Sequence, residues 1–345
     1  MADLSVQGPS IWVVSDGRAG IERQSLSLAR ALAAPERAAK LAHIRSDAHR
    51  DAPLRLTPSG WMTRLRPDFW PAPLAALPPD QRALLVPPWP DVWIATGRRS
   101  IAYSRWLKRA SAGATLVVQT QDPKVSLSNF DLVIPPEHDA LTGANVFPIL
   151  GPPTWWSPEE IAAAQARFPE LGADPGPRVL VSVGGDSKTH RMSDPAAARV
   201  EYAIRTAAAQ AGKLWITVSR RTPDAMRTRL RLLAEETGAR FWENQDRDGP
   251  NPYLAWLASC DAALVTEDSA NMLADPAFFG KPVHLMKLEG GSPRFDRLHR
   301  GFIDRHAARW HAGKIETWSY PPIREAERAA DEIMRRLLAR RPAPA

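Results

Sequence analysis

Short apolar runs alternate with segments of helical length along this chain of 345 residues, and the alternation starts again after Leu150 to Pro153. Strands that alternate with helices indicate βα units and a mostly parallel sheet. A chain of this length also exceeds what one hydrophobic core usually supports. The sequence therefore predicts two doubly wound, Rossmann-like α/β domains, over residues 1–150 and 151–320, followed by an amphipathic helix and tail over residues 321–345.

The elements expected in each half follow from the apolar runs and the turn residues between them. In the first half we expect helices over residues 22–34 and 100–110, and strands over residues 11–15, 41–44, 91–96, 115–120 and 131–134. In the second half we expect helices over residues 158–168, 195–211, 223–237, 253–259 and 269–279, and strands over residues 178–183, 214–218, 241–242, 262–265 and 283–286. The segment 324–338 carries apolar residues on one side at helical spacing, which indicates an amphipathic helix packed on a domain.

Composition places the chain among globular proteins, since 44% of its residues are hydrophobic and 24% are charged. A net charge of +7 favours an anionic partner, such as a nucleotide or phospholipid headgroups. Nucleic acid is not expected as a partner, because no recognised nucleic-acid-binding module is present. Cys260 is the single cysteine, so it cannot form an internal disulfide, and no Cys/His spacing indicates a bound metal.

The N-terminus carries no basic segment followed by an apolar one, and no run of about 18 apolar residues occurs in the chain. We therefore expect a cytoplasmic protein, one that could also bind peripherally to the inner face of the cytoplasmic membrane through its positive charge. Residues 61–70 mix aromatic side chains with Arg64 and Arg66. Such a segment suits either a membrane interface or a lipid-linked acceptor, or else a lid on the core of the first domain.

Glycine and polar residues follow the strand predicted over residues 178–183, at the edge where doubly wound sheets bind their ligands. This turn contains Gly184, Gly185, Ser187, Lys188 and Arg191. Its glycine amides could cradle a diphosphate, with the two cations adding positive charge. The alternative is a tight exit from the strand, since neither the Walker A nor the G-x-G-x-x-G spacing is present.

Adjacent arginines follow the next predicted strand of the second domain. Ser219, Arg220 and Arg221 stand at its end, and two guanidinium groups in that place suit a phosphate clamp. The same residues are ordinary on a solvated loop, so both interpretations stand.

The segment from Thr266 to Asn271 joins a strand to a helix. Its hydroxyls and the helix N-terminus could meet the phosphates of a sugar donor. Asp268 or Ser269 would also cap this helix without any ligand. Asp275, further along the helix, could meet a ribose hydroxyl.

The first predicted strand–helix turn of the chain reads Asp16-Gly17-Arg18-Ala19-Gly20. This is where an open sheet most often meets its ligand. Asp16 could accept the proton of an acceptor hydroxyl, and Arg18 could contact an anionic group; the alternative is a helix cap with a flexible turn. Further candidates for the acceptor side are Gly17, Gly20, Gln119 and Gln121, with Glu22, Asp122 and His138 as alternative bases.

Several of these segments, taken in order, resemble the bacterial and plant family named for mitochondrial fission (elongated mitochondria). The resemblance extends from about residue 10 to 290 and rests on Asp16-Gly17-Arg18-Ala19-Gly20 with Gln24, Gln121-Asp122-Pro123, Phe130 to Val133, Pro136-Glu137-His138-Asp139, Val181 to Gly185, Asn251 to Leu254, Thr266 to Asn271 and Gly280 to Val283. The chain departs from the family pattern at Asp186, where proline is usual, and at Ala274-Asp275-Pro276, where Ser-Glu-Ala is usual.

The resemblance implies the GT-B fold, because the family is similar to nucleotide-sugar-dependent glycosyltransferases. It implies a nucleoside-diphosphate sugar as co-substrate on the second domain, with a hydroxyl acceptor on a lipid or cell-envelope glycan bound by the first domain across a cleft. No permanently bound cofactor and no metal are required, since helix N-termini and cations stabilise the leaving diphosphate. The alternative is an inherited fold used as a binding or recruiting module without turnover.

Overall fold

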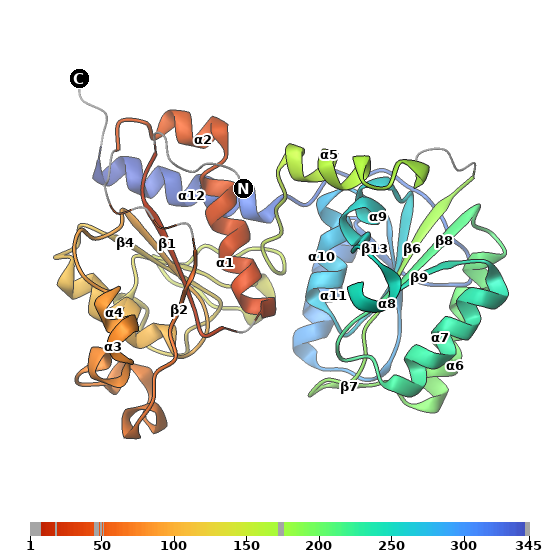
Figure 1. Ribbon diagram of the computed structural model, residues 1–345, viewed down its shortest axis with the longest axis horizontal. Helices are drawn as coiled ribbons and strands as arrows, with labels where there is room; N and C mark the ends of the chain where they lie inside the picture. Colours follow the sequence, from red (N-terminus) through yellow and green to blue (C-terminus); the bar gives the residue numbers. More distant parts are fainter. Residues whose placement is uncertain are drawn as a thin grey trace. The chain divides into compact units, whose positions relative to one another are not determined.

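The computed structural model describes residues 8–17, 19–44, 48, 50, 52–171 and 176–341. The chain divides into two compact units, which are Met1–Trp155 with Arg324–Ala345, and Trp156–Ile323 (Figure 1). Each unit is built from parallel strands and helices. The predicted α/β fold class is therefore confirmed.

The first unit contains a five-stranded parallel sheet in the order β2-β1-β3-β4-β5. Its strands are β1 (Ile11–Ser15), β2 (Leu54–Arg55), β3 (Val92–Ala95), β4 (Leu116–Thr120) and β5 (Leu132–Ile134). Its α-helices are α1 (Ala19–Leu32), α2 (Pro35–Lys40), α3 (Pro79–Ala83), α4 (Ser100–Ala110) and α12 (Glu325–Arg340). Short 3-10 turns are η1 (Trp61–Arg64), η2 (Pro67–Phe69), η3 (Pro73–Ala76), η4 (Leu127–Asn129) and η5 (Glu137–Asp139).

The strand expected over residues 41–44 is wrong. Leu41 ends α2, its N–H group bonds back to the helix, and the Ile44 N–H donates to the Leu41 carbonyl oxygen at 2.9 Å in a turn. Both side chains are buried in the core. These apolar residues therefore anchor the end of a helix in the core. The strand next to β1 at this edge of the sheet is β2, which has only two residues.

Both faces of the first sheet are buried, as expected for parallel strands covered by helices. Trp12 and Trp93, which are paired across β1 and β3, belong to the core on the side of α4. Val13 and Ile94, the next residues along the same strands, belong to the core on the side of α1 and α12. Successive side chains thus alternate between two apolar layers.

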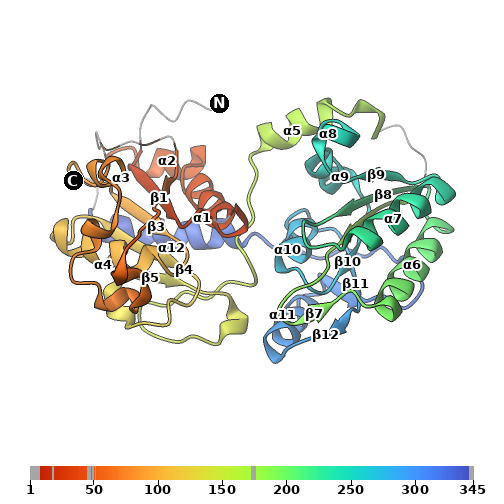
Figure 2. The ribbon, with the colours of Figure 1, turned by 60° about the horizontal axis from the view of Figure 1, so that its bottom comes forward.

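The C-terminal helix α12 completes the first unit, although about 170 residues of the second unit precede it. It lies alongside α1 in both views (Figures 1 and 2). Its buried side chains are Ala326, Ala329, Ala330, Ile333 and Leu337. The predicted amphipathic helix is therefore confirmed, and its apolar side covers one face of the first sheet.

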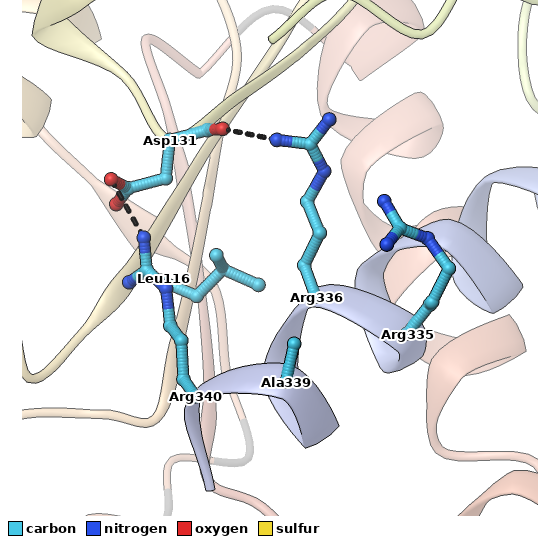
Figure 3. Close-up of a pocket in the computed structure, with 6 residues that line it drawn as sticks. All are labelled: Leu116, Asp131, Arg335, Arg336, Ala339 and Arg340. Carbon is cyan, nitrogen blue, oxygen red and sulfur yellow. Dashed lines mark hydrogen bonds and ion pairs between the residues drawn. The ribbon is translucent and has the colours of Figure 1, made fainter.

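Arginines near the end of α12 attach the helix to Asp131, which directly precedes β5 (Figure 3). Arg336 donates to the Asp131 carbonyl oxygen at 2.8 Å, and Arg340 forms an ion pair with the Asp131 carboxylate at 2.8 Å. Between them lies a cavity of about 350 Å³, lined by Leu116, Asp131, Arg335, Arg336, Ala339 and Arg340. The basic end of α12 thus supports the fold of the first unit.

The second unit contains a six-stranded parallel sheet in the order β13-β11-β10-β6-β8-β9 and a two-stranded antiparallel pair, β12-β7. Its strands are β6 (Arg178–Val183), β7 (His190–Arg191), β8 (Lys213–Val218), β9 (Arg240–Trp242), β10 (Ala262–Thr266), β11 (Val283–Met286), β12 (Glu289–Gly290) and β13 (Ala308–Trp310). Its helices are α5 (Pro158–Ala166), η6 (Pro169–Leu171), α6 (Asp194–Ala208), α7 (Asp224–Thr237), α8 (Gln245–Asp248), α9 (Tyr253–Ser259), α10 (Ala270–Phe278) and α11 (Pro293–Asp304).

The second sheet is also covered on both faces. Figure 2 shows α6 and α7 along one face, where Val181, Ile216 and Leu264 face these helices in one core. On the other face, Trp215 of β8 stacks on Trp256 of α9 with ring centroids 5.9 Å apart. Both faces are thus filled by apolar packing. Within the described residues, no helix has the length and apolar character needed to cross a bilayer.

Candidate functional site

The four central strands of the second sheet, β11, β10, β6 and β8, end side by side at one edge. Most of the candidate donor residues proposed from the sequence for this unit lie in the loops that follow these strands, whereas Thr266 ends β10, Arg191 lies in β7, and Asn271 and Asp275 lie within α10. In doubly wound sheets this carboxyl edge is where ligands bind. Whether these residues form one site depends on how the loops contact one another.

One buried carboxylate joins three of these loops. Asp268 accepts hydrogen bonds from the Gly185 N–H at 3.1 Å and from the Thr266 hydroxyl at 2.7 Å. Asp268 also forms an ion pair, at 2.8 Å, with the guanidinium of Arg221 in the loop after β8. Thr266 in turn accepts the Gly184 N–H at 2.7 Å. The loops after β6, β8 and β10 therefore contact one another at this edge of the sheet.

The two glycines are required by this convergence. A Cβ atom on Gly184 would overlap the Asp268 carboxylate, and one on Gly185 would overlap the backbone carbonyl of Arg221. The amides of both glycines donate to Thr266 and Asp268 within the protein. In this arrangement they hold the loops together, which corresponds to the tight strand exit, the alternative to a diphosphate cradle.

We predict that Gly185→Ala destabilises the second unit by about 1–3 kcal/mol, because the added methyl group meets backbone that cannot rotate away. Chemical denaturation of the variant measures this. Gly8→Ala is the control, since a Cβ there would meet only the Ala38 methyl group at 4.0 Å. Equal stability of both variants would show that the loop after β8 can move aside.

The rest of the turn after β6 is exposed. The Ser187 hydroxyl accepts the N–H groups of Thr189 and His190, at 3.2 and 3.0 Å, which closes the turn. Lys188 and Arg191 are exposed to solvent. Asp186 is also exposed, and its carboxylate accepts the Met192 N–H at 2.8 Å. Two cations and one carboxylate thus remain accessible from this loop.

The two arginines after β8 have different environments. Arg221 is held by Asp268, whereas Arg220 is exposed and makes no ion pair with any residue in the described part of the chain. Ser219 accepts the Arg221 N–H at 3.1 Å and so shapes the turn. Arg220 is therefore the guanidinium of this loop that can receive an anion.

Ser269 caps α10, because its hydroxyl accepts the Met272 N–H at 3.4 Å. Asn271 is half-buried in the first turn of this helix. Asp275 is buried within α10, and its carboxylate accepts the Tyr253 hydroxyl at 3.1 Å. The cap foreseen for Ser269 is present, and the Asp275 carboxylate is enclosed by packing between α9 and α10.

The loop after β11 belongs to the same edge and was missed in the sequence. Gly290 pairs with His190, and the Gly291 N–H donates to the Thr189 carbonyl oxygen at 2.7 Å. Ser292 caps α11 by accepting the Phe295 N–H at 3.3 Å. The signal was available, because two glycines and a serine between a strand and a helix are typical of a loop at a ligand edge.

Titratable side chains are buried beneath these loops. His299 donates from Nε2 to the Glu267 carbonyl oxygen at 2.8 Å, and its Nδ1 lies 4.0 Å from the Glu267 carboxylate. Burial raises the pKa of Glu267 and lowers the pKa of His299. The His190 ring packs edge-on against Phe295, with centroids 4.8 Å apart, and burial lowers its pKa as well. These contacts fix α11 against the loop after β10.

We predict that the free energy of unfolding of the second unit falls as the pH decreases from about 6.5. Burial lowers the pKa values of His190, His284, His299 and His311, so the unfolded chain binds more protons than the folded one below the usual histidine pKa. Glu267, with its raised pKa, opposes the trend only in part. Denaturation at pH 7.5 and 5.5 measures this, and equal stability at both values would contradict it.

In the first unit, the turn after β1 is built by a short chain of hydrogen bonds. The Gly17 N–H donates to the Ser15 hydroxyl, which donates to the carboxylate of Glu22. Arg55 at the end of β2 forms a two-pronged ion pair with Glu22, at 2.7 Å for the shortest contact. The hydrogen bonds from Arg55 lower the pKa of Glu22, which makes Glu22 a weak candidate base.

Asp16 follows β1 at the carboxyl edge of the first sheet and lies against Gly97, which follows β3. A Cβ atom on Gly97 would lie 2.7 Å from the Asp16 carboxylate, and Gly97 also has a φ of +86°. A side chain at residue 97 would therefore push Asp16 aside. Local patterns in the sequence do not indicate this contact, because the two positions are 81 residues apart.

The other acceptor-side candidates have mainly structural contacts. Gln119 is buried and accepts the Ser104 hydroxyl at 3.4 Å. Gln121 has a φ of +65° and donates to the Gln24 side chain at 3.1 Å, which joins β4 to α1. Gln119 therefore belongs to the core of the unit, and Gln121 to the edge beside α1.

Of the remaining candidates, Asp122 is held by the N–H and ammonium groups of Lys124. His138 is buried in η5, with Nε2 3.9 Å from the Asp139 carboxylate. Gly17 has a φ of +82° and Gly20 lies in the first turn of α1, whereas Arg18 is outside the described residues. No cluster of three or more potential metal ligands is found among the described residues.

Comparison with known proteins gives the family. The family model for mitochondrial fission ELM1 matches residues 19–337. The mitochondrial fission protein ELM1 of Arabidopsis thaliana is 29% identical over 280 residues, which cover 73% of this chain and 65% of the plant protein. The uncharacterized protein RP120 of Rickettsia prowazekii is 24% identical over 288 residues, covering 71% of this chain and 79% of the relative.

One solved structure agrees with this fold over nearly the whole chain. A Listeria monocytogenes protein assigned as UDP-N-acetylglucosamine 2-epimerase is similar with a TM-score of 0.50 and 11% identity, over 98% of both chains. ADP-heptose lipopolysaccharide heptosyltransferase II of Escherichia coli is similar with a TM-score of 0.44 and 14% identity, over 96% of this chain and 99% of that one. The chain therefore has the α/β fold of GT-B proteins and belongs to the mitochondrial fission ELM1 family.

Proposed function

We propose that this protein is a GT-B-type glycosyltransferase that moves a sugar from a nucleoside-diphosphate sugar to a hydroxyl acceptor on a lipid or cell-envelope glycan. The observation that supports this most is the convergence of the loops after β6, β8 and β10 on Asp268 at the carboxyl edge of the second sheet. An edge built in this way is a rigid platform, and polar groups on a rigid platform bind and orient a ligand well.

The donor diphosphate is proposed to lie over this platform. Arg220, Lys188 and Arg191 present accessible positive charge there. The N-terminus of α10, with Ser269 and Asn271, supplies N–H groups and a partial positive charge toward the phosphates. These groups would stabilise the diphosphate as it leaves, so the proposed reaction requires no metal ion.

Arg220→Ala is expected to weaken binding of a nucleoside diphosphate by about tenfold to hundredfold, because a hydrogen bond to a charged group contributes roughly 1.5–3 kcal/mol. Isothermal titration measures the affinity. Lys213→Ala is the matched control, since Lys213 lies at the amino end of the strand that Arg220 follows. A similar loss in both variants would mean that overall charge, not this site, attracts the nucleotide.

A binding module without turnover is the second candidate, and one observation favours it. The amides of Gly184 and Gly185 are used inside the protein, and the accessible Asp186 carboxylate adds negative charge beside the proposed diphosphate. A site of this kind could hold a partner or a nucleotide without driving transfer. Binding of another protein, without transfer of a sugar, would then be the function.

A thermal-shift screen with nucleoside diphosphates and their sugars tests the donor site directly. A ligand at 100 times its Kd stabilises the protein by about 2.7 kcal/mol, which is readily seen. Transfer of radiolabelled sugar from the best donor to extracted lipids or glycans then separates the candidates. Binding with transfer supports the enzyme, binding without transfer supports the module, and no binding by any nucleotide contradicts the donor site.

The protein is further proposed to act in the cytoplasm, with peripheral contact to the inner face of the cytoplasmic membrane. Its net charge of +7 favours such contact. The net charge does not identify which part of the protein would contact the membrane.

A further inference from the structure

Three apolar side chains project from the segment between β2 and β3 in the first unit. Trp61 is 64% exposed, Leu65 38% and Phe69 64%, and Arg64 and Arg66 stand between them in the sequence. These five residues are called the aromatic–arginine surface. Large apolar side chains that are exposed so close together in the chain favour contact of this segment with another molecule.

The exposure is imposed by the packing of neighbouring residues. Met62 and Trp70 are buried in the core on the side of α4, where the Trp70 ring meets Tyr103 edge-on with centroids 6.1 Å apart. The Trp70 indole N–H donates to the Leu65 carbonyl oxygen at 3.4 Å. Met62 and Trp70 thus take the inward positions beside Trp61 and Phe69. The surface is therefore held outward by the fold.

The same segment is closed by local hydrogen bonds. The N–H groups of Leu65 and Phe69 donate to the carbonyl oxygens of Met62 and Arg66, at 3.0 and 2.9 Å. Gly60, with a φ of +86°, starts η1 in a conformation that favours glycine. The exposed side chains thus stand on two tight turns, η1 and η2.

The arginines give the surface a positive charge. Arg64 is exposed and forms no ion pair with any described residue. Arg66 lies over the Phe69 ring, 5.2 Å from its centroid, and pairs with Asp68 at 3.0 Å. Aromatic rings with arginines beside them suit the headgroup region of a bilayer, where the ring meets acyl chains and the guanidinium meets phosphate.

The area favours a membrane over a protein partner. Three projecting side chains offer on the order of 300 Å² of apolar surface, whereas a stable protein interface buries about 800 Å² on each partner. Insertion of a few aromatic side chains into a bilayer has no such requirement. We infer that the aromatic–arginine surface docks onto an anionic lipid bilayer, with Trp61, Leu65 and Phe69 in its interface and Arg64 against lipid phosphates.

This inference is tested with the full chain by co-sedimentation with vesicles of phosphatidylcholine alone or with phosphatidylglycerol. We expect the unaltered protein to bind the phosphatidylglycerol vesicles. The double variant Trp61→Ala/Phe69→Ala should bind them at least about tenfold more weakly. Arg64→Gln should reduce binding to these vesicles by about fivefold, since one cation near an anionic surface contributes roughly that much. Circular dichroism should show both variants folded, because the replaced side chains are exposed.

Tyr202→Ala/Leu232→Ala is the matched control, since these side chains are 70% and 60% exposed on helices of the second unit. It should bind vesicles as the unaltered protein does. The inference is overturned if the unaltered protein ignores phosphatidylglycerol vesicles, if it binds both kinds equally, or if the aromatic variant binds normally. Nucleotide thermal shifts of the same variants keep this result separate from the proposed donor site.

Discussion

Replacing Ile333 and Leu337 with alanine is expected to unfold the first unit under conditions where the second unit remains folded. Both side chains are buried between α12 and the sheet. Each such truncation costs about 2–5 kcal/mol, and a typical domain has only about 5–15 kcal/mol of stability. Because the residues are one turn apart on α12, their costs will not add fully. The pair still removes most of the stability of the unit.

Hydrogen exchange followed by mass spectrometry can measure this effect in each unit separately. Exchange should rise in peptides before Trp155 and remain low in peptides between Trp156 and Ile323. Arg335→Ala is the control on the same helix, because its side chain is exposed and its ion pair with Glu332 lies at the surface, where such pairs contribute little to stability. If both units lose protection together, they unfold as one cooperative body, and the assignment of α12 to the first unit alone is wrong.

Asp16→Asn is expected to lower turnover by about 10²–10⁴-fold, if the protein transfers sugar to a hydroxyl as proposed. The substitution preserves the shape of the side chain but removes the group that would accept the acceptor's proton. Asp16 stands at the carboxyl end of β1, and Gly97 leaves room for its carboxylate.

The donor affinity separates a role in catalysis from one in folding. Thermal shifts by the nucleoside diphosphate should be the same in Asp16→Asn and in the unaltered protein. Asp80→Asn, an exposed aspartate in α3 of the same unit, is the control and should retain full turnover. Near-normal turnover of Asp16→Asn would remove Asp16 from the mechanism and direct attention to His138.

The sequence could predict elements whose signal is local. Buried parallel strands are continuous apolar runs, so β3, β4, β6 and β10 were identified to within a residue or two. The edge strand β2 has two residues, Leu54 and Arg55, which is too short for any periodicity. Leu41 and Ile44 carry the apolar signal of a strand but are buried as the end of a helix, because burial and not strand geometry determines where apolar residues occur.

The candidate site shows the same division. The sequence located the loops after β6, β8 and β10, since turn and cap residues follow apolar runs there. The sequence did not show whether the missing Cβ of each glycine makes room for a phosphate or for a neighbouring loop. Only the tertiary structure shows that Gly184 and Gly185 make room for Asp268 and Arg221. Both a bound phosphate and a neighbouring loop require a residue without a Cβ. The presence of glycine therefore does not distinguish them.

The sequence by itself determined that the chain forms two α/β units and that its last helix has one apolar side, because both follow from the spacing of residues close together in the chain. Only the tertiary structure decided that α12 packs against α1 in the first unit, that Asp268 joins three loops, and that Trp61 and Phe69 face solvent while Met62 and Trp70 do not. These outcomes depend on which surfaces meet across long separations in sequence. Local periodicity carries no information about such pairings.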